Sequence, residues 1–169
     1  MYRKIRYLFL LPVILSGFFS GCMKQENFPD TPQIEYMNYT NVFDTGRFAI
    51  RGILNISFRD GNGDIGLSPG DTFPPFQKKG DYYYNYVIMY FEKQNGVYQQ
   101  LDLDPPFSSR IPVLTPLDPG KSIKGFIVDT LGLNPHPLND TIQIKAYIYD
   151  RGLRKSNVIS TPEIILRRR

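Results

Sequence analysis

The chain has 169 residues, with 20 Lys and Arg against 16 Asp and Glu, one cysteine, one histidine and no tryptophan. One cysteine excludes an internal disulfide, and one histidine excludes a zinc site built mainly from imidazoles. Without Arg3, Lys4 and Arg6 at the start of the chain, 17 basic residues remain against 16 acidic ones. Nucleic-acid binding needs a basic face or stripe, so this balance predicts no nucleic-acid partner.

The first 21 residues have the pattern of a secretory signal. The basic residues are followed by an apolar run over residues 7–19, and the small residues Ser20 and Gly21 then precede Cys22. An apolar run of about 13 residues is shorter than the ~20 that a membrane-spanning helix needs. We therefore expect residues 1–21 to be a signal peptide that is cleaved before Cys22.

The stretch "FSGC", residues 19–22, resembles the lipobox of bacterial lipoproteins, although Phe19 stands where leucine is usual. The resemblance implies that Cys22 is acylated and becomes the new N-terminus, with several acyl chains holding the protein in the membrane. Residues 22–32 are polar and contain two prolines, and we expect them to be the lipidated cysteine and a tether. This predicts a lipoprotein of the bacterial outer membrane, and "CMKQEN" leaves both its periplasmic and its cell-surface orientation open.

Residues 33–169 show alternating apolar and polar side chains and no helical period, which predicts a single all-β domain. Asn95-Gly96 predicts a hairpin turn after a central strand at 84–93. Further strands are expected at 33–39, 110–114, 121–130, 141–149 and 158–166. In "RFAIRGILNISF", residues 47–58, the side chains expected on the inward face of a half-buried strand are Phe48, Ile50, Leu54, Ile56 and Phe58.

The end of the chain is typical of an immunoglobulin-like hairpin. The stretch "TIQIKAYIYDRGLRKSNVISTPEIIL", residues 141–166, gives a strand, a polar turn at 150–157 and a final strand. Seven or eight short strands joined by loops rich in Pro and Gly are typical of two packed antiparallel sheets. We therefore predict an all-β, immunoglobulin-like antiparallel β-sandwich. The side chains expected inward in the strand at 141–149 are Ile142, Ile144, Ala146 and Ile148.

Residues 59–66, "RDGNGDIG", together with this last hairpin resemble small single-domain, immunoglobulin-like lipoproteins of Bacteroidota. Many of those proteins carry a loop of the form Asp-Gly-Asp-Gly-Asp-Ile-Gly after an early strand. Members of this group mostly have no assigned activity. The resemblance therefore implies a cell-envelope lipoprotein and no particular reaction.

The same loop predicts a Ca²⁺ site. Asp60, Asn62 and Asp64 stand at alternate positions, as side-chain ligands do in acyclic calcium loops. With Asp60 as the first ligand, Gly66 can supply a backbone carbonyl at the seventh position and Asp71 falls at the twelfth. We expect these five residues to bind calcium in a structural role, because the ion would neutralise a loop that otherwise repels itself.

The loop departs from the EF-hand pattern, because Ile65 stands where that pattern has glycine and the flanking segments are not helical. A site in a β-sandwich would need further ligands, and the sequence does not choose among Asp102, Asp104, Asp129 and Asp150. The competing interpretation is a plain turn. Glycine accepts positive φ, and Asp and Asn side chains bond to nearby backbone amides.

The sequence indicates no catalytic centre, so we expect a protein that is not an enzyme. His136, the only histidine, lies between prolines in a loop and is expected to be solvated, and Cys22 is assigned to the lipid. Hydrolysis by paired carboxylates is a less favoured alternative. It requires a cleft that holds two acids with shifted pKa values.

Tyrosines gather around the strand expected at 84–93. On a strand, four of them share one face, and an exposed row of this kind could bind a glycan or a protein partner; they are Tyr82, Tyr84, Tyr86 and Tyr90. The competing interpretation packs these rings between the sheets. We thus expect a lipid-anchored, non-catalytic interaction or accessory module, calcium-stabilised, whose protein or glycan partner is unknown. The alternative is a glycan-binding lipoprotein that uses the tyrosine face.

Overall fold

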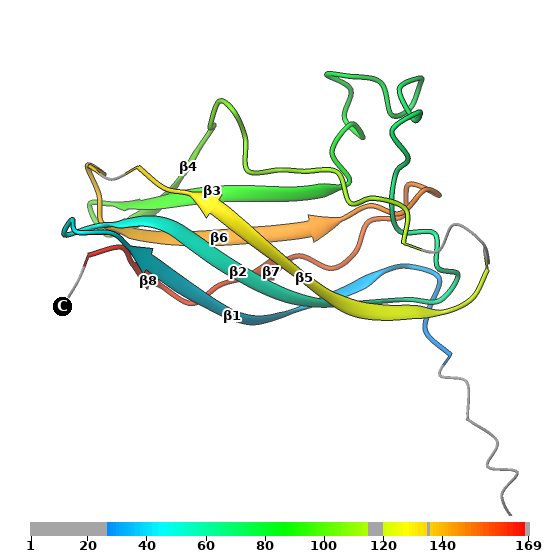
Figure 1. Cartoon of the computed structure of the whole chain (residues 1–169), viewed down its shortest axis with the longest axis horizontal. Coiled ribbons are helices and arrows are strands. Elements are labelled where there is room, and N and C mark those ends of the chain that lie inside the picture. The colour runs from blue at the N-terminus through cyan, green and yellow to red at the C-terminus, as the bar shows by residue number, and fades with distance from the viewer. Residues whose placement is uncertain (1–26, 115–119, 135, 168–169) are drawn as a thin grey trace, which may run out of the picture.

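The computed structural model describes residues 27–114, 120–134 and 136–167 and shows two antiparallel β-sheets that face each other as in a β-sandwich (Figure 1). The prediction of an all-β chain is confirmed. No helix of the described residues has the length and apolarity to cross a membrane. The predicted signal peptide and Cys22 lie outside the described residues. The strands are β1 (Gln33–Phe43), β2 (Ala49–Asp60), β3 (Tyr86–Gln94), β4 (Val97–Leu101), β5 (Ile123–Gly132), β6 (Thr141–Ile148), β7 (Ile159–Ser160) and β8 (Ile164–Ile165).

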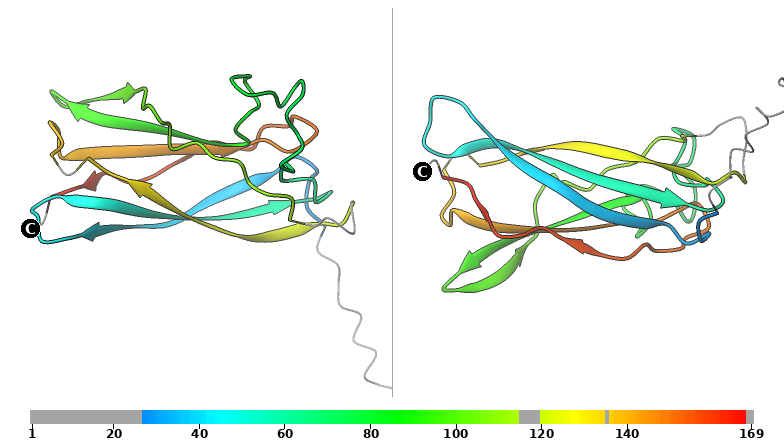
Figure 2. Two further views of the ribbon diagram at one scale, coloured as in Figure 1. Left: turned by 45° about the horizontal axis from the view of Figure 1, so that its top comes forward. Right: turned by 90° about the horizontal axis from the view of Figure 1, so that it is seen from below.

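The first sheet has the order β1-β2-β5, and the second has the order β4-β3-β6-β7 with β8 also paired to β6. Figure 2 shows the two layers from two further directions. β5 pairs with β2 along its whole length, from Gly132 opposite Arg51 to Ile123 opposite Asp60. On its other side no strand of the described chain lies beside it. The outer edge of β5 is therefore open within the described chain.

Alternation along the strands places the core between the sheets. In β2, Leu54, Ile56 and Phe58 are buried, and in β6 every second side chain from Ile142 to Ile148 is buried. Burying one Leu or Ile side chain contributes about 1.5–3 kcal/mol by removing apolar surface from water. The predicted inward faces are confirmed in β6 and, from Leu54 onward, in β2.

The start of β2 differs from the predicted alternation. Ala49 is fully buried, whereas Phe48 and Ile50 are only partly buried. The cause is a register shift against β1, because the pairing passes from Arg51 to Ala49 and skips Ile50. An extra residue in one strand reverses the side-chain direction beyond it. The prediction that Phe48 and Ile50 point inward is therefore wrong.

Two further predictions about strands can be compared with the structure. The hairpin at Asn95-Gly96 is confirmed, and both residues have positive φ, 52° and 83°. The strand expected at 158–166 is divided into the short strands β7 and β8. The piece expected at 110–114 joins neither sheet.

The N-terminal residues 28–30 pack against the loop that follows β2. The Gly61 amide donates to the Pro29 carbonyl at 2.8 Å, and Asp30 lies 3.7 Å from the Arg154 guanidinium. A Cβ at Gly61 would lie 2.2 Å from the Phe28 carbonyl oxygen, so this approach needs glycine. Part of the segment that the sequence assigns to the tether therefore belongs to the domain.

Ile144, at the centre of β6, is 1% exposed. We expect Ile144→Ala to lower the free energy of unfolding by about 2–5 kcal/mol, because the substitution leaves a cavity between the sheets. Denaturant unfolding followed by circular dichroism measures this. Val97→Ala is the matched control, because Val97 is 58% exposed and its truncation should change stability by less than about 0.5 kcal/mol. Equal losses in the two variants would contradict the assigned core.

Candidate metal centre

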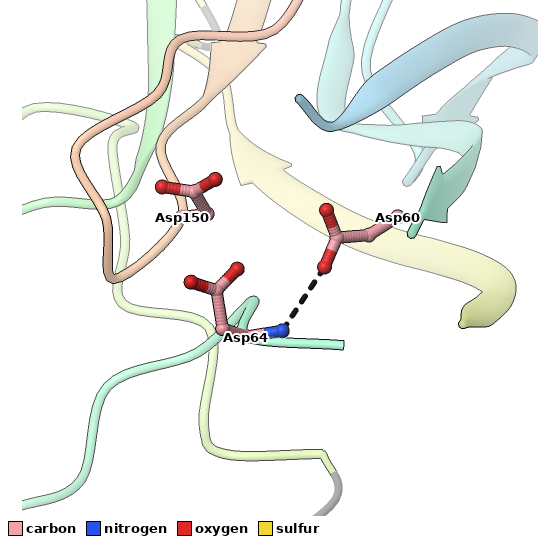
Figure 3. A group of neighbouring side chains, drawn as sticks. All are labelled: Asp60, Asp64 and Asp150. Carbon is pink, nitrogen blue, oxygen red and sulfur yellow. Dashed lines mark hydrogen bonds between the residues drawn. The ribbon is translucent and has the colours of Figure 1, made fainter. Parts of the chain in front are cut away.

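Three aspartates converge at one end of the sandwich (Figure 3). Asp60 is the last residue of β2, Asp64 lies in the following loop, and Asp150 comes shortly after β6 in the opposite sheet. One carboxylate oxygen from each lies within 4.8 Å of the others. Asp60 and Asp150 are 0% and 1% exposed. We call these three residues the aspartate centre.

The strand period explains why two of these acids are buried. Phe58 points inward, and Asp60 occupies the next inward position of β2. Ile148 likewise points inward at the end of β6, and Asp150 is two residues further on. Because side chains two positions apart lie on the same face of an extended chain, both acids are turned into the space between the sheets. One acid from each sheet therefore reaches the same end of the core.

The loop after β2 is fixed by a glycine and by two apolar side chains. Gly63 has a φ of +69°, and a Cβ there would lie 2.3 Å from the Lys121 carbonyl oxygen. Ile65 and Leu67 are 1% and 3% exposed. Ile65, the residue that breaks the EF-hand pattern, is therefore a core side chain that helps to close this end of the sandwich.

Arg154 contacts two of the three carboxylates. Its Nε donates to Asp150 Oδ2 at 2.6 Å, and its Nη2 donates to Asp64 Oδ2 at 3.1 Å. Its backbone amide donates to Asp150 Oδ1 at 2.8 Å, which holds that carboxylate in place. The three ionised carboxylates of the aspartate centre and this one guanidinium have a formal charge of −2. That charge matches one divalent cation.

Several oxygens of the loop are buried without a partner. In the described part of the chain, Asp60 Oδ1, Asn62 Oδ1 and Asp64 Oδ1 are shielded from solvent and accept no hydrogen bond. The other Asp60 oxygen accepts the Asp64 amide at 3.0 Å, which orients the carboxylate (Figure 3). A buried acceptor left unmatched costs about 1–3 kcal/mol, and more when it is charged. A cation bound among the aspartates would offset this cost for each oxygen that it contacts.

Burial and mutual repulsion raise the pKa values of the loop acids. Desolvation, and after it the charge of Asp64, raises the pKa of Asp60 to about 6. The pKa of Asp64 is raised by desolvation and then by Asp150, while Arg154 acts in the opposite direction. A cation among these groups would favour their ionised forms and lower both pKa values.

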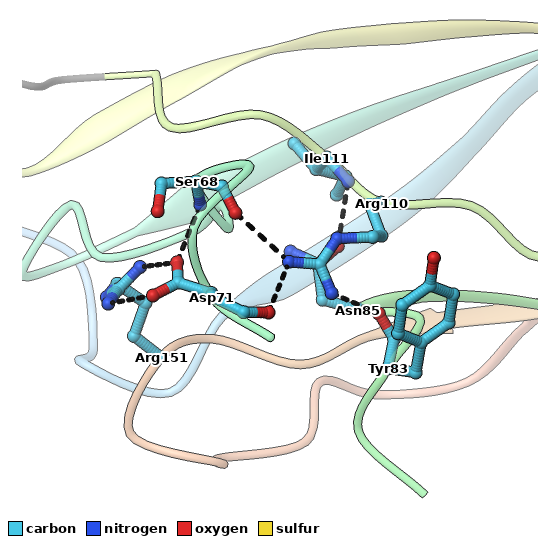
Figure 4. Close-up of polar contacts among 7 residues, drawn as sticks. All are labelled: Ser68, Asp71, Tyr83, Asn85, Arg110, Ile111 and Arg151. Carbon is cyan, nitrogen blue, oxygen red and sulfur yellow. Dashed lines mark hydrogen bonds and ion pairs between the residues drawn. The ribbon is translucent and has the colours of Figure 1, made fainter. Parts of the chain in front are cut away.

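One of the predicted ligands, Asp71, has another partner in the structure. Both carboxylate oxygens of Asp71 are bound by the Arg151 guanidinium, and one also accepts the Ser68 amide at 2.6 Å (Figure 4). The hydrogen bond from Arg151 is the main cause that lowers the pKa of Asp71 to about 2. Gly66 has a φ of +119° and packs against the backbone of Pro112. Asp71 therefore belongs to an ion pair with Arg151, and the twelve-residue calcium register stays a prediction.

The chain around Asp71 is held by Arg110. Its guanidinium donates to the carbonyls of Tyr83, Ser68 and Asp71 at 2.9, 3.1 and 3.0 Å (Figure 4). The connection from β2 to β3 contains no strand, so these carbonyls have no ladder partner. Charge-assisted hydrogen bonds from one side chain replace the missing ladder.

The four tyrosines do not form an exposed row. Tyr86 and Tyr90 are 1% and 8% exposed and belong to the core. Tyr82 packs edge-on against Tyr149, with ring centroids 5.0 Å apart and planes at 75°. Tyr84 packs edge-on against its sequence neighbour. Because two of the four rings are buried in the core, the rings do not form one exposed face, which corrects the hypothesis of a tyrosine platform for glycans.

Three clefts among the described residues do not bring acids together in pairs. A cleft of about 490 Å³ includes Glu35, whose carboxylate pairs with Arg59 at 3.1 Å. A cleft of about 350 Å³ includes Asp129, and one of about 220 Å³ includes Asp102. Glycoside hydrolysis needs two carboxyl groups across the scissile bond, so these clefts do not support a hydrolase. His136 is exposed.

The sequence did not decide which acid outside the loop joins the site, and it did not identify Arg154. The parity of the buried positions in β6 would have selected Asp150, since it continues the inward series. Asp102 and Asp104 are exposed, and Asp129 lines a different cleft. No periodic signal marks Arg154, because it reaches the carboxylates from a turn.

Comparisons with protein-family models, with curated proteins and with solved structures found no match for this chain. The resemblance to Bacteroidota lipoproteins therefore stays a prediction from the sequence. The site is described from its own geometry.

We expect Asp60 to make the metal-free protein less stable as the pH rises. Its pKa is raised from 3.8 to about 6 in the folded state, so its stabilising contribution is present below the lower value and is lost as the pH rises through the higher one. In chelator, the unfolding free energy of the unaltered chain minus that of Asp60→Asn should fall between about pH 4 and about pH 7. Urea unfolding at several pH values measures this difference.

Asp71→Asn is the control, because the pKa of Asp71 is shifted in the opposite direction to that of Asp60. The pKa of Asp71 is lowered to about 2, so its contribution is present above the ordinary value and is lost only as the pH falls toward 2. The unfolding free energy of the unaltered chain minus that of Asp71→Asn should stay nearly constant over the pH range in which the corresponding value for Asp60→Asn falls. A difference for Asp60→Asn that is flat with pH would contradict the assigned burial.

Proposed function

We propose that this protein is a calcium-stabilised, lipid-anchored β-sandwich of the bacterial outer membrane that serves as a non-catalytic interaction or accessory module. The observation that carries the calcium assignment is the set of unpartnered buried oxygens on Asp60, Asn62 and Asp64. Asp60 and Asp64 lie in a cluster of formal charge −2 that is completed by Asp150 and Arg154. The module's partner is a protein or a glycan that the chain does not identify.

The donor set suits a hard divalent cation. Asp60, Asp64 and Asp150 offer carboxylate oxygens, and Asn62 offers an amide oxygen. Ca²⁺ accepts six to eight oxygen ligands in flexible geometry, whereas Mg²⁺ demands a small octahedron and keeps several of its waters. Ligands spread over a loop and a second strand end favour the larger, more tolerant ion. Waters would complete its shell.

At this position the ion would join the two sheets. Asp60 belongs to β2 in the first sheet, and Asp150 follows β6 in the second. The loop is already connected to the second sheet, because the Arg151 amide donates to the Asp64 carbonyl at 3.1 Å. Without a cation, the acids repel one another at this junction. A ligand that binds only the folded state adds stability by mass action.

The sandwich is proposed to be immunoglobulin-like, on the support of its strand order. The first, second and fifth strands share one sheet, and the third, fourth and sixth share the other with the two last short strands. Immunoglobulin domains likewise divide their early and late strands between two antiparallel sheets. Such a module binds partners through loops and strand edges and needs no catalytic group.

Lipid anchoring is supported by the sequence before the domain. The basic start, the short apolar run and the small residues before Cys22 are the parts of a lipoprotein signal. Residues 28–30, which lead from that cysteine, meet the loop next to the aspartate centre (Figure 1). The chain therefore enters the described domain at the end of the sandwich that holds the centre.

Thermal unfolding of the full-length chain in calcium, in magnesium and in chelator tests the metal assignment. At a free calcium concentration about 100 times the Kd, binding should add about 2.7 kcal/mol. We expect a rise in Tm of several degrees that magnesium at the same concentration does not reproduce. Scanning calorimetry measures the three values of Tm. Equal values in calcium and in chelator would overturn the assignment.

The double variant Asp60→Asn/Asp64→Asn should lose the calcium-dependent rise, because amides keep the shape of the ligands without their charge. Asp71→Asn is the matched control. Asp71 pairs with Arg151 outside the aspartate centre, so its loss should lower Tm by a similar amount in calcium and in chelator. Loss of the calcium effect in this control would instead favour the register predicted from the sequence.

Cys22→Ser tests the anchor. The variant should take up no labelled palmitate and should move from the detergent-rich to the aqueous phase of a Triton X-114 separation, because its hydroxyl does not replace the acylated thiol. Lys24→Ala, two residues further on, should keep both the label and the detergent phase. Labelling of Cys22→Ser equal to that of the unaltered chain would contradict lipidation at this residue.

A further inference from the structure

Two further unpartnered buried polar atoms lie outside the aspartate centre. Tyr86 is 1% exposed and its hydroxyl has no partner among the described residues. Asp129 Oδ2 is also shielded from solvent and unpartnered in the described chain. Tyr86 comes from β3 and Asp129 from β5, so the two sheets contribute one group each. Both line the cleft of about 350 Å³.

The two groups are close enough to influence each other. Desolvation, and after it the charge of Asp129, raises the pKa of Tyr86. Desolvation also raises the pKa of Asp129. An ionised carboxylate in this position lacks the countercharge that buried acids usually have. The cleft therefore favours a positively charged occupant.

The remaining wall of the cleft is largely apolar, with Phe58, Ile111 and Ile127 among its residues. Arg110 also lines it, but its guanidinium is directed to three backbone carbonyls. A cationic occupant with an aliphatic stem matches both parts of this cleft. Lysine has this composition, because four methylene groups lie between its backbone and its ammonium group.

The cleft lies along β5, and no described strand pairs with the outer edge of β5. Ile127 and Asp129 are partly buried on the inner face of β5, whereas Phe126 and Val128, which also line the cleft, are 71% and 66% exposed. An unpaired strand edge with exposed apolar side chains is a template for another extended chain. Such a chain turns alternate side chains toward the cleft.

We propose that this cleft binds the ammonium group of a lysine that a partner protein presents on an extended segment paired with β5. The ammonium group donates to the Asp129 carboxylate and the Tyr86 hydroxyl, and its stem packs against Phe58 and Ile127. The main chain of the segment completes the β5 ladder, and its outward side chains cover Phe126 and Val128.

Asp129 also admits a simpler role, because inward-pointing charges on edge strands oppose aggregation. In that case Asp129→Asn should cause self-association of the protein, and no lysine-dependent binding should exist. The two roles therefore give opposite results in one binding experiment.

The probe is a fluorescent ten-residue peptide that alternates threonine and valine, with lysine replacing the central valine. Its binding to the full-length chain is measured by anisotropy, in calcium and in chelator, because the cleft shares no residue with the aspartate centre. A second peptide carries norleucine in place of lysine and so lacks only the charge. A third keeps the lysine but is N-methylated at alternate residues, which prevents ladder pairing. n-Butylammonium is tested as a competitor.

We expect the lysine peptide to bind at least about tenfold more tightly than the norleucine peptide, as a charge-assisted hydrogen bond predicts. Asp129→Asn should remove this preference, Tyr86→Phe should reduce it, and N-methylation should weaken binding. Asp102→Asn is the matched control, because Asp102 is exposed and lines another cleft, and it should bind like the unaltered chain. The value of Tm for each variant verifies folding.

Equal binding of the lysine and norleucine peptides, an Asp129→Asn variant that keeps the preference, or no binding at millimolar concentration would overturn the proposal. If n-butylammonium competes but the N-methylated peptide binds as well as the first, the cleft takes ammonium groups and the pairing with β5 is wrong. Calcium-independent binding together with an absent calcium effect on Tm would leave this proposal standing while the proposed metal function fails.

Discussion

Burial of the Asp60 carboxylate is the constraint on which one end of this molecule depends. The alternation of β2 turns this acid into the space between the sheets, where an uncompensated charge costs several kcal/mol. The neighbouring features can all be understood as compensation. The Asp64 amide binds one oxygen, and Arg154 offsets part of the charge that Asp150 and Asp64 add. One oxygen of Asp60 stays unmatched, and this imbalance is the reason to assign a cation.

The same reasoning explains how an irregular connection becomes ordered. Between β2 and β3 the chain forms no strand, and side chains add to the backbone hydrogen bonds of its turns: Arg110 binds three carbonyls, and Arg151 binds both oxygens of Asp71. Ile65 and Leu67 add apolar burial at the start of the connection. Loops that depend on a few charged contacts are more sensitive to substitution of those residues than strands are, because a ladder distributes its hydrogen bonds over many residues.

The sequence predicted what depends on short-range pattern. Period two gave the inward series through Leu54 and along β6, and Asn95-Gly96 gave the hairpin. The prediction from the sequence failed where the pairing of distant segments determines which side chains point inward. The register shift that turns Ala49 inward is an example. The candidate site likewise has a part that the local sequence predicts and a part that only the fold determines. The loop suggested Asp60, Asn62 and Asp64, but spacing alone also suggested Asp71, which Arg151 binds from 80 residues away. Only the fold brings Arg154 to the carboxylates.

The entry of residues 28–30 beside the aspartate centre has a mechanical consequence. A force applied through the N-terminus would first load the bond between Gly61 and Pro29 and the contact between Asp30 and Arg154. Next in line is the pair Gln33 and Arg59 at the end of the β1–β2 ladder. Because Arg167 pairs with Phe48 at the other end of β2, a force between the two ends of the domain would run along the strands and load the β1–β2 pairs together in shear. The contacts around the carboxylates would therefore be the first to carry such a force.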